Sequence, residues 1–231
     1  MATKKRRLLT TLAATTAVLA FLIISAASVV WANGLRYNTA TGAFERTVLV
    51  AVDGSPQYVD VLLNGTKLTN HIPYRVRNLL PGHYTVELEK PGFQTWTQSF
   101  WLSVGQVGLI KDPTLIASKP LITTSSSPLG GNNLEKLDFG LELSGGELTD
   151  SGELITRYSR DPFQIHRFNQ YYLYQVGSEL RLYLTNGSQD YLIYTAQDSK
   201  KLPLALYPST WQVAVEDGSA VKMIDLTTPT P

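Results

Sequence analysis

The chain has 231 residues, of which 43% are hydrophobic and 17% charged, a composition typical of one large or two small globular domains and unlike that of disordered or fibrous chains. It has no cysteine, which excludes disulfides, thiolate zinc sites, iron–sulfur clusters and Cys–His catalysis, and the three histidines His71, His83 and His166 are too few for a histidine-rich metal site. The formal charge is +1, but without the cluster Lys4 to Arg7 there are 16 basic and 19 acidic residues, a net charge of −3. Nucleic-acid binding is not expected, because it requires a basic excess.

The N-terminus has the pattern of a membrane anchor. The basic cluster precedes an uncharged run from Leu8 to Leu35, and some 24 residues from Leu8 to Trp31 would form a helix of about 36 Å, enough to cross a hydrocarbon core of about 30 Å. Its serines and threonines can hydrogen-bond to carbonyls one turn earlier. Trp31 then lies at the interface and the basic cluster stays cytoplasmic. The sequence therefore predicts a cytoplasmic cluster and transmembrane anchor in residues 1–34, with residues 36–231 outside the cell membrane.

Two other interpretations of this segment stay open. A cleaved secretory signal is one, because Val30-Trp31-Ala32 offers small residues where signal peptidase cleaves. The uncharged run is longer than the usual 7–15 residues of a signal, which favours retention. A helix in a soluble core is the other, and the preceding basic cluster argues against it. Retention and cleavage both export residues 36–231.

From Thr47 onward the pattern is β. Short apolar or alternating runs end at turn signals; they lie at 48–52, 58–65, 74–79, 83–90 and 95–102. Asn64-Gly65 suits a type I′ hairpin, and Pro81-Gly82 and Pro91-Gly92 suit turns with glycine at the second position. Five or six strands in roughly 70 residues predict a small antiparallel β-sandwich within residues 35–116.

A second β region follows at 135–227, after a Ser/Thr/Pro/Gly-rich segment at 117–134 that has the composition of a linker, and residues 228–231 form a tail. Residues 171–184 resemble residues 211–226, about 40 positions later, and 141–159 contains a fainter copy; such a period is typical of four-stranded propeller blades. About 95 residues supply only two blades, whereas closed propellers need four or more. Either this region is an independent sheet pair, or its open edges are covered by a partner or a second copy of the chain.

Part of the first β region resembles the PEGA domain, a surface-associated β module of bacteria and archaea. The matching residues are Val59 to Gly65 (VDVLLNG), Ile72-Pro73 in place of the family's Thr-Pro, and 79–96 (LLPGHYTVELEKPGFQTW); Ser55-Pro56-Gln57-Tyr58 stands where the family has Pro-Glu-Gly-Ala. Residues 34–47 (GLRYNTATGAFERT) also resemble the segment that precedes this domain in membrane-anchored proteins of small-genome bacteria, which often continue into propeller-like repeats. The resemblance implies a transthyretin-like or carbohydrate-binding-like sandwich, an envelope location and no known catalysis.

No familiar catalytic or phosphate-binding motif occurs, and the sequence assigns no catalytic, cofactor-binding or metal-binding residues. A triad of Ser159, Asp161 and His166 can be drawn, but a triad is defined by geometry. Glu87 and Glu89 share a strand face that is expected to be solvated. The sequons at Asn64 and Asn186 are expected to be hairpin turns if the source is bacterial.

Aromatic residues suggest how the protein binds. Trp96 with Phe100, and Tyr172 with Tyr174 opposite in register to Tyr171, could present rings on an exposed sheet face, where they suit sugars or protein interfaces. The glycan hypothesis fails if Trp96 and Trp101 are buried and no glycan alters their fluorescence. The predicted function is that of a non-catalytic, envelope-anchored protein that presents β modules to protein partners or to further copies of itself. The alternative is a module that binds cell-wall or host glycan; an exported hydrolase is a distant third.

Overall fold

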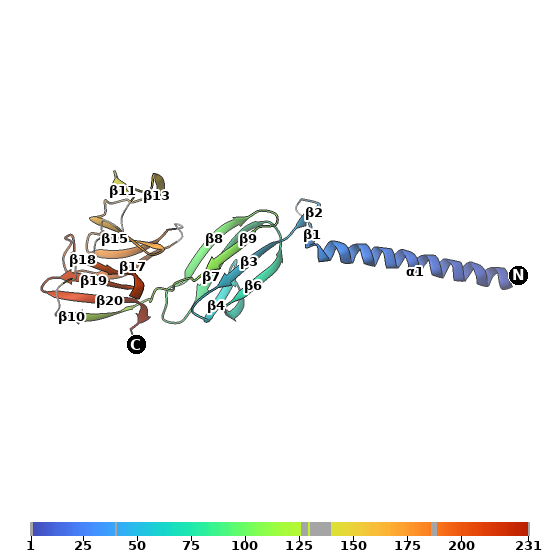
Figure 1. Cartoon of the computed structure of the whole chain (residues 1–231), viewed down its shortest axis with the longest axis horizontal. Coiled ribbons are helices and arrows are strands. Elements are labelled where there is room, and N and C mark those ends of the chain that lie inside the picture. The colour runs from blue at the N-terminus through green and yellow to red at the C-terminus, as the bar shows by residue number, and fades with distance from the viewer. Residues whose placement is uncertain (1, 40, 126–128, 130–139, 186–188, 231) are drawn as a thin grey trace. The chain divides into compact units, whose positions relative to one another are not determined.

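The structure, a computed structural model, describes residues 2–39, 41–125, 129, 140–185 and 189–230. These residues form one long N-terminal helix and many short strands in several small antiparallel sheets (Figure 1). The prediction of a mainly β protein with one apolar N-terminal helix is confirmed at this level. The chain divides into two compact units, Met1–Val52, Tyr74–Tyr84 and Phe100–Ile110 in the first, and Asp53–Pro73, Thr85–Ser99 and Lys111–Pro231 in the second.

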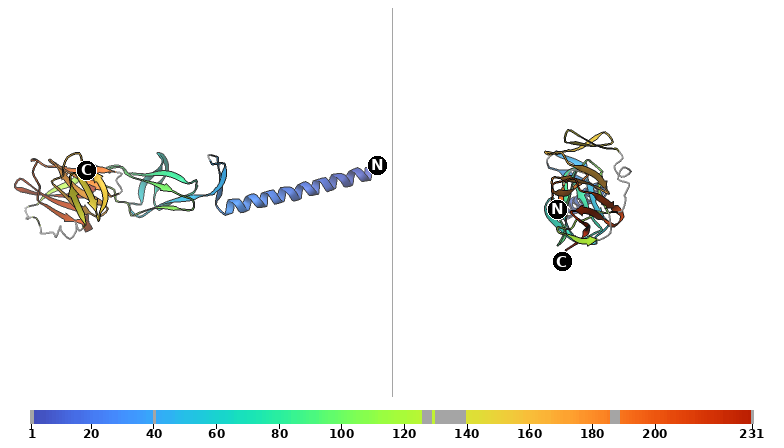
Figure 2. Two further views of the ribbon diagram at one scale, coloured as in Figure 1. Left: turned by 90° about the horizontal axis from the view of Figure 1, so that it is seen from above. Right: turned by 90° about the vertical axis from the view of Figure 1, so that its left-hand side faces the viewer.

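Helix α1 (Ala2–Ala32) is a single continuous rod of 31 residues (Figure 2). No residue of its stretch Leu12–Ala32 is buried, and at 21 residues, or about 31 Å, this stretch is long and apolar enough to span a membrane. Hydroxyls inside this stretch bond to carbonyls one turn earlier, as expected: Thr15 and Thr16 to Leu12, and Ser28 to Ile24, at 2.8–2.9 Å. The helix ends where Gly34 adopts a φ of +67°.

The rest of the first unit begins with a hairpin of β1 (Leu35–Asn38) and β2 (Ala43–Arg46). A three-stranded sheet follows, in the order β6 (Tyr74–Leu79), β3 (Val48–Asp53) and β9 (Val107–Lys111). The central strand β3 is the most buried, with Val48, Val50 and Val52 at most 2% exposed. Its three alternating valines favour the strand conformation and form the most buried part of the strand.

A four-stranded sheet has the order β5 (Thr66–His71), β4 (Tyr58–Leu63), β7 (Gly82–Glu89) and β8 (Trp96–Leu102). Alternate residues of β4 and β7, among them Val61 and Leu88, are buried. Asn64 and Gly65 both have positive φ, which confirms the predicted hairpin turn. The turn at Pro91-Gly92 is also present, with Gly92 at φ +83° and the Phe93 N–H donating to the Lys90 carbonyl.

Three sheets make up the rest of the second unit. One is β11 (Leu141–Ser144), β12 (Glu147–Asp150) and β13 (Glu153–Arg157), and the second is β14 (Gln164–Phe168), β15 (Tyr171–Val176), β16 (Glu179–Leu184) and β17 (Asp190–Thr195). The third has the order β10 (Pro120–Ser125), β20 (Ala220–Pro229), β19 (Gln212–Asp217) and β18 (Leu204–Tyr207). The two similar segments, 171–184 and 211–226, fold alike: each forms the central hairpin of a four-stranded sheet, β15–β16 and β19–β20.

The expected linker is structured where it is described. The Ala117 and Ser118 amides donate to the carbonyls of Leu226 and Gly92 at 2.8 and 2.9 Å, and Ala117 is fully buried. Residues 120–125 then form β10, because their uncharged, partly β-branched sequence suits pairing with β20. Residues 126–128 and 130–134 of the expected linker, and 135–139 of the region after it, lie outside the described residues. The expected tail also differs, since β20 continues to Pro229 and the Thr230 amide bonds to Lys119.

Side-chain hydrogen bonds also join the two β regions within the second unit. Tyr171 donates its hydroxyl proton to the Thr114 carbonyl at 2.9 Å, and Tyr191 donates to the Thr95 carbonyl at 3.0 Å. The Gln189 amide donates to the Thr97 hydroxyl at 2.8 Å. Residues 95–97 and Thr114 are therefore held to residues 171–191 by side-chain hydrogen bonds as well as by the chain.

Candidate interaction surfaces

The aromatic residues singled out by the sequence have different environments. Trp96 is 4% exposed and Trp101 is 69% exposed, so the condition set for the glycan hypothesis is met by only one of the two tryptophans. Phe100 is half-buried, and its ring lies so close to Gly108 that a Cβ there would be 2.6 Å away. Tyr172 and Tyr174 share a face of β15 but are 2% and 5% exposed. Their ring faces are not accessible for stacking on a sugar.

These two tyrosines direct their hydroxyl groups to carboxylates. Tyr172 donates to Oδ2 of Asp150 on β12, and Tyr174 donates to Oδ2 of Asp190 on β17, both at 2.7 Å. Burial, followed by the hydrogen bond to Asp150, raises the pKa of Tyr172 to about 12. Both phenols therefore stay protonated as donors at neutral pH. The contact between Tyr172 and Asp150 fastens the sheet β11–β13 to the sheet β14–β17.

The Asp150 carboxylate accepts hydrogen bonds from three side chains. Burial alone would raise its pKa, but hydrogen bonds from Tyr172, Ser151 and Arg167 outweigh this effect and lower the pKa below its usual value. The Arg167 guanidinium donates to Oδ1 at 2.5 Å. The lowered pKa keeps this carboxylate ionised at neutral pH, as an acceptor for these hydrogen bonds.

The residues of the conceivable triad do not share one environment. His166 is buried on β14 with its Nε2 3.3 Å from Oε1 of Gln164, whereas Ser159 and Asp161 are exposed. Glu87 is half-buried and Glu89 exposed, on the strand face opposite the buried Val86 and Leu88.

The first sequon has a structural role. The Asn64 side-chain oxygen accepts the Thr85 amide at 2.8 Å, and the Asn64 amide donates to the Thr85 carbonyl at 2.8 Å, which fixes the hairpin turn against β7. The second sequon, at Asn186, lies outside the described residues. Within the described ranges, no group of three or more His, Asp or Glu side chains is arranged to hold a metal ion.

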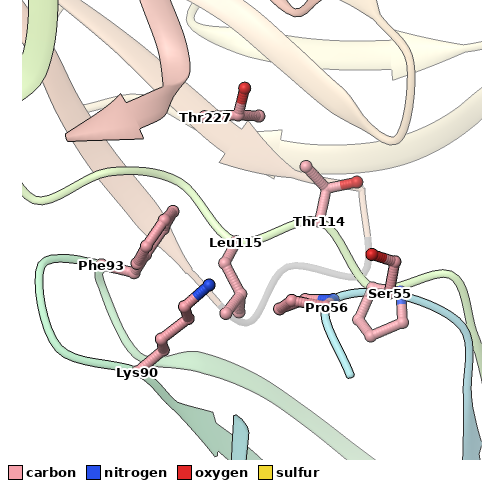
Figure 3. A pocket seen from close by; sticks show the side chains of 8 residues that line it. Ser55, Pro56, Lys90, Phe93, Thr114, Leu115 and Thr227 are labelled. Carbon is pink, nitrogen blue, oxygen red and sulfur yellow. The ribbon is translucent and has the colours of Figure 1, made fainter. Parts of the chain in front are cut away.

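A pocket of about 250 Å³ lies within the second unit (Figure 3). It is lined by Ser55, Pro56, Lys90, Phe93, Pro113, Thr114, Leu115 and Thr227. Its polar side chains are three hydroxyls and the Lys90 ammonium, which is 4.8 Å from the centre of the Phe93 ring. The lining has no carboxylate or imidazole for acid–base chemistry, and the volume is below the 300–1,000 Å³ usual for small-molecule sites.

A larger groove of about 400 Å³ lies between two strand edges of the second unit. β10 and β17 are both terminal strands of their sheets as described, and both contribute side chains to the groove. Its lining is Ser118, Lys119, Pro120, Ile122, Leu192, Ile193, Tyr194, Thr195 and Thr230. Ile122 on β10 and Leu192 on β17 are 44% and 41% exposed. Apolar side chains next to unpaired strand edges are the features that an added strand recognises.

The two edges have little of the charge that usually prevents pairing with other chains. Among the six residues of each strand, Asp190 is the only charged one. Each strand has one irregularity in its pairing, which leaves 121–125 of β10 and 190–192 of β17 as regular stretches. Tyr194 lines the groove, but its hydroxyl donates to Asp217 at 2.8 Å. Sequence reasoning missed this groove because it assigned Ile122 to a linker; the uncharged run Leu121-Ile122-Thr123-Thr124 was the available signal.

Comparison with known proteins adds no assignment to this geometry. No model of a protein family matches the chain, and no curated protein matches it.

Proposed function

We propose that this is a non-catalytic, single-pass membrane protein that binds other proteins through the groove between β10 and β17. In this proposal α1 spans the cell membrane with the N-terminus in the cytoplasm, and residues 36–231 are extracytoplasmic. The basic residues before the helix support that orientation. The module that begins after the helix is proposed to be PEGA-like, on the sequence resemblance alone.

The groove is the observation that carries the proposal. A partner segment in extended conformation would add to the free edge of β10 or β17 and place apolar side chains against Ile122 and Leu192. Main-chain hydrogen bonds would supply affinity, and the two apolar residues would supply register. A second copy of the chain is one such partner, because its own strands have open edges.

The sheet composition supports the same proposal. The sheets β14–β17 and β18–β20 with β10 have the four strands of a propeller blade, and β11–β13 has three. Three blade-like sheets are fewer than the four that a closed propeller needs. A partner protein that pairs with the strand edges left open by the missing blade would cover them.

Site-specific photocrosslinking tests the groove. A photoreactive residue at Ile122 of the full chain, in its membrane, is expected to crosslink a discrete partner, and Ile122→Lys should reduce recovery of that partner about tenfold, since a charge in an apolar contact costs at least ~1.4 kcal/mol. Leu154 on β13 is a matched control, because it is 45% exposed. Crosslinking at both positions alike, or no effect of Ile122→Lys, would refute the groove as the binding site.

A glycan-binding module is the second candidate, favoured by the 69% exposure of Trp101. Titration of the full chain with purified wall polysaccharide should then change tryptophan fluorescence, and Trp101→Ala should abolish the change. The buried Trp96 is unsuited to this role, so the candidate depends on Trp101.

A further inference from the structure

We infer that one surface of the first unit lies in the interfacial region of the membrane that α1 spans. This surface, called the interfacial surface, consists of Tyr37, Phe44, Trp101, Val104, Val107 and Leu109. The inference rests on the proposed membrane anchoring and adds a second contact with lipid to it.

Most of the highly exposed apolar side chains in the described β regions belong to this surface. Seven large hydrophobic residues outside the helix are more than half exposed, and six of them are the interfacial surface, at 54–69%. Only Tyr58 is elsewhere. Such a concentration differs from the scattered exposed apolar residues that soluble proteins normally have, and marks a contact with protein or membrane.

Hydrogen bonds hold the β1–β2 hairpin and the turn between β8 and β9 close to the end of the helix. The Thr47 amide donates to the Gly34 carbonyl at 2.9 Å, which closes the β1–β2 hairpin back onto the residue that ends α1. Two positions later, the Leu49 amide donates to the Gln106 carbonyl at 3.2 Å, in the turn between β8 and β9. Since two residues of extended chain span at most about 7 Å, the turn is held near the helix end.

Bilayer dimensions then put the part of this surface nearest the helix end at the depth of the headgroups. If Leu12–Ala32 crosses the hydrocarbon core, Ala32 is at its outer boundary, and the polar interface extends about 5–8 Å further. Gly34 and Thr47 fall within that layer, and the Ser103–Gln106 turn lies beside it. A lipid surface is therefore already within reach of these side chains, without a further partner.

The chemistry of the neighbouring residues suits that depth. Tyr37 and Phe44 pack edge to face with their ring centres 5.4 Å apart, and the Arg36 guanidinium lies 3.5 Å from the centre of the Trp31 ring. Aromatic rings are enriched at membrane interfaces, and arginine binds lipid phosphates there. Strand β9 continues this exposed apolar side beyond the turn, since Val107 and Leu109 are exposed while Gly108 and Ile110 are buried.

The lack of cysteine permits a direct test. Three single-cysteine variants of the full chain, Val104→Cys, Leu154→Cys and Ala20→Cys, are labelled with an environment-sensitive fluorophore and reconstituted in phosphatidylcholine vesicles. Nitroxide lipids labelled at the headgroup or in the acyl chain serve as quenchers. We expect headgroup quenching at position 104, acyl-chain quenching at position 20 in the helix, and no quenching at position 154.

The outcomes separate this inference from the anchor. Quenching at 20 without quenching at 104 would overturn the interfacial surface and leave the transmembrane helix in place. No quenching at 20 would overturn both. Equal headgroup quenching at 104 and 154 would show non-specific adsorption and would also overturn the inference.

Discussion

Asp150 illustrates why the aromatic residues of this chain are placed as they are. It accepts hydrogen bonds from Tyr172, Arg167 and Ser151, and it joins β12 to the sheet that contains Tyr172. A tyrosine in a β-rich sequence therefore need not present its ring to a ligand. Here its polar end satisfies a partly buried carboxylate while its ring fills the space between two sheets.

Tyr172→Phe should destabilise the protein by about 1.5–3 kcal/mol, because it removes a hydrogen bond to a charged group and leaves Asp150 less well satisfied. The free energy of unfolding is measured by chemical denaturation. Tyr183→Phe is the matched control: Tyr183 lies directly opposite Tyr172 in the β15–β16 pairing and is half-buried. A loss no larger than that of the control would contradict the assigned role.

The same contact predicts a pH dependence. Because the pKa of Asp150 is lowered by folding, its contribution is fully present above its unfolded value of about 3.8 and is lost as the pH falls through the lower folded value. The difference in unfolding free energy between Tyr172→Phe and the unsubstituted protein should therefore be constant from pH 7 to 5 and shrink below pH 4. A difference that stays constant to pH 2 would assign the effect to packing.

At the level of elements, short sequence patterns predicted the helix, turns and hairpins better than amino-acid composition predicted the linker. The apolar helix, the Asn64-Gly65 turn and the hairpins at 171–184 and 211–226 followed from patterns within a few residues. Composition failed at 117–125, because Ser, Thr and Pro are common in linkers whereas the pairing of β10 depends on β20, about 100 residues later. The environments of Trp96, Tyr172 and Tyr174 could not be predicted either, since alternation shows which residues share a face of a strand but not which face another sheet covers.

Hydrogen exchange tests whether the start of the expected linker is held by hydrogen bonds or is flexible. The amides of Ala117 and Ser118 are expected to exchange as slowly as those of β20, because both are hydrogen-bonded and Ala117 is fully buried. The exposed bend at 198–200 provides a rapidly exchanging reference in the same protein. Exchange of the Ala117 and Ser118 amides at the rate of that bend would contradict the hydrogen bonds described for them.

For the whole molecule, the proposed orientation in a membrane is the first property to test. Ser199→Cys, on an exposed bend, should react with a membrane-impermeant maleimide in intact cells, and Thr3→Cys should react only after permeabilisation. Reaction at Thr3→Cys in intact cells would reverse the proposed topology. Loss of residue 3 from the mature protein would instead establish cleavage of the N-terminal segment.

The pairing of β10 with β20 also determines when the protein can finish folding. Strand β10 is synthesised about 100 residues before its described partner, and under the proposed topology the C-terminus is the last part to cross the membrane. Until then β10 lacks the strand with which it pairs, and an unpaired, uncharged strand favours pairing with other chains. In that topology β10 can enter its sheet only after β20 has also been exported, so the time taken by translocation, and not only the stability of the finished fold, would set how long this edge stays open to other chains.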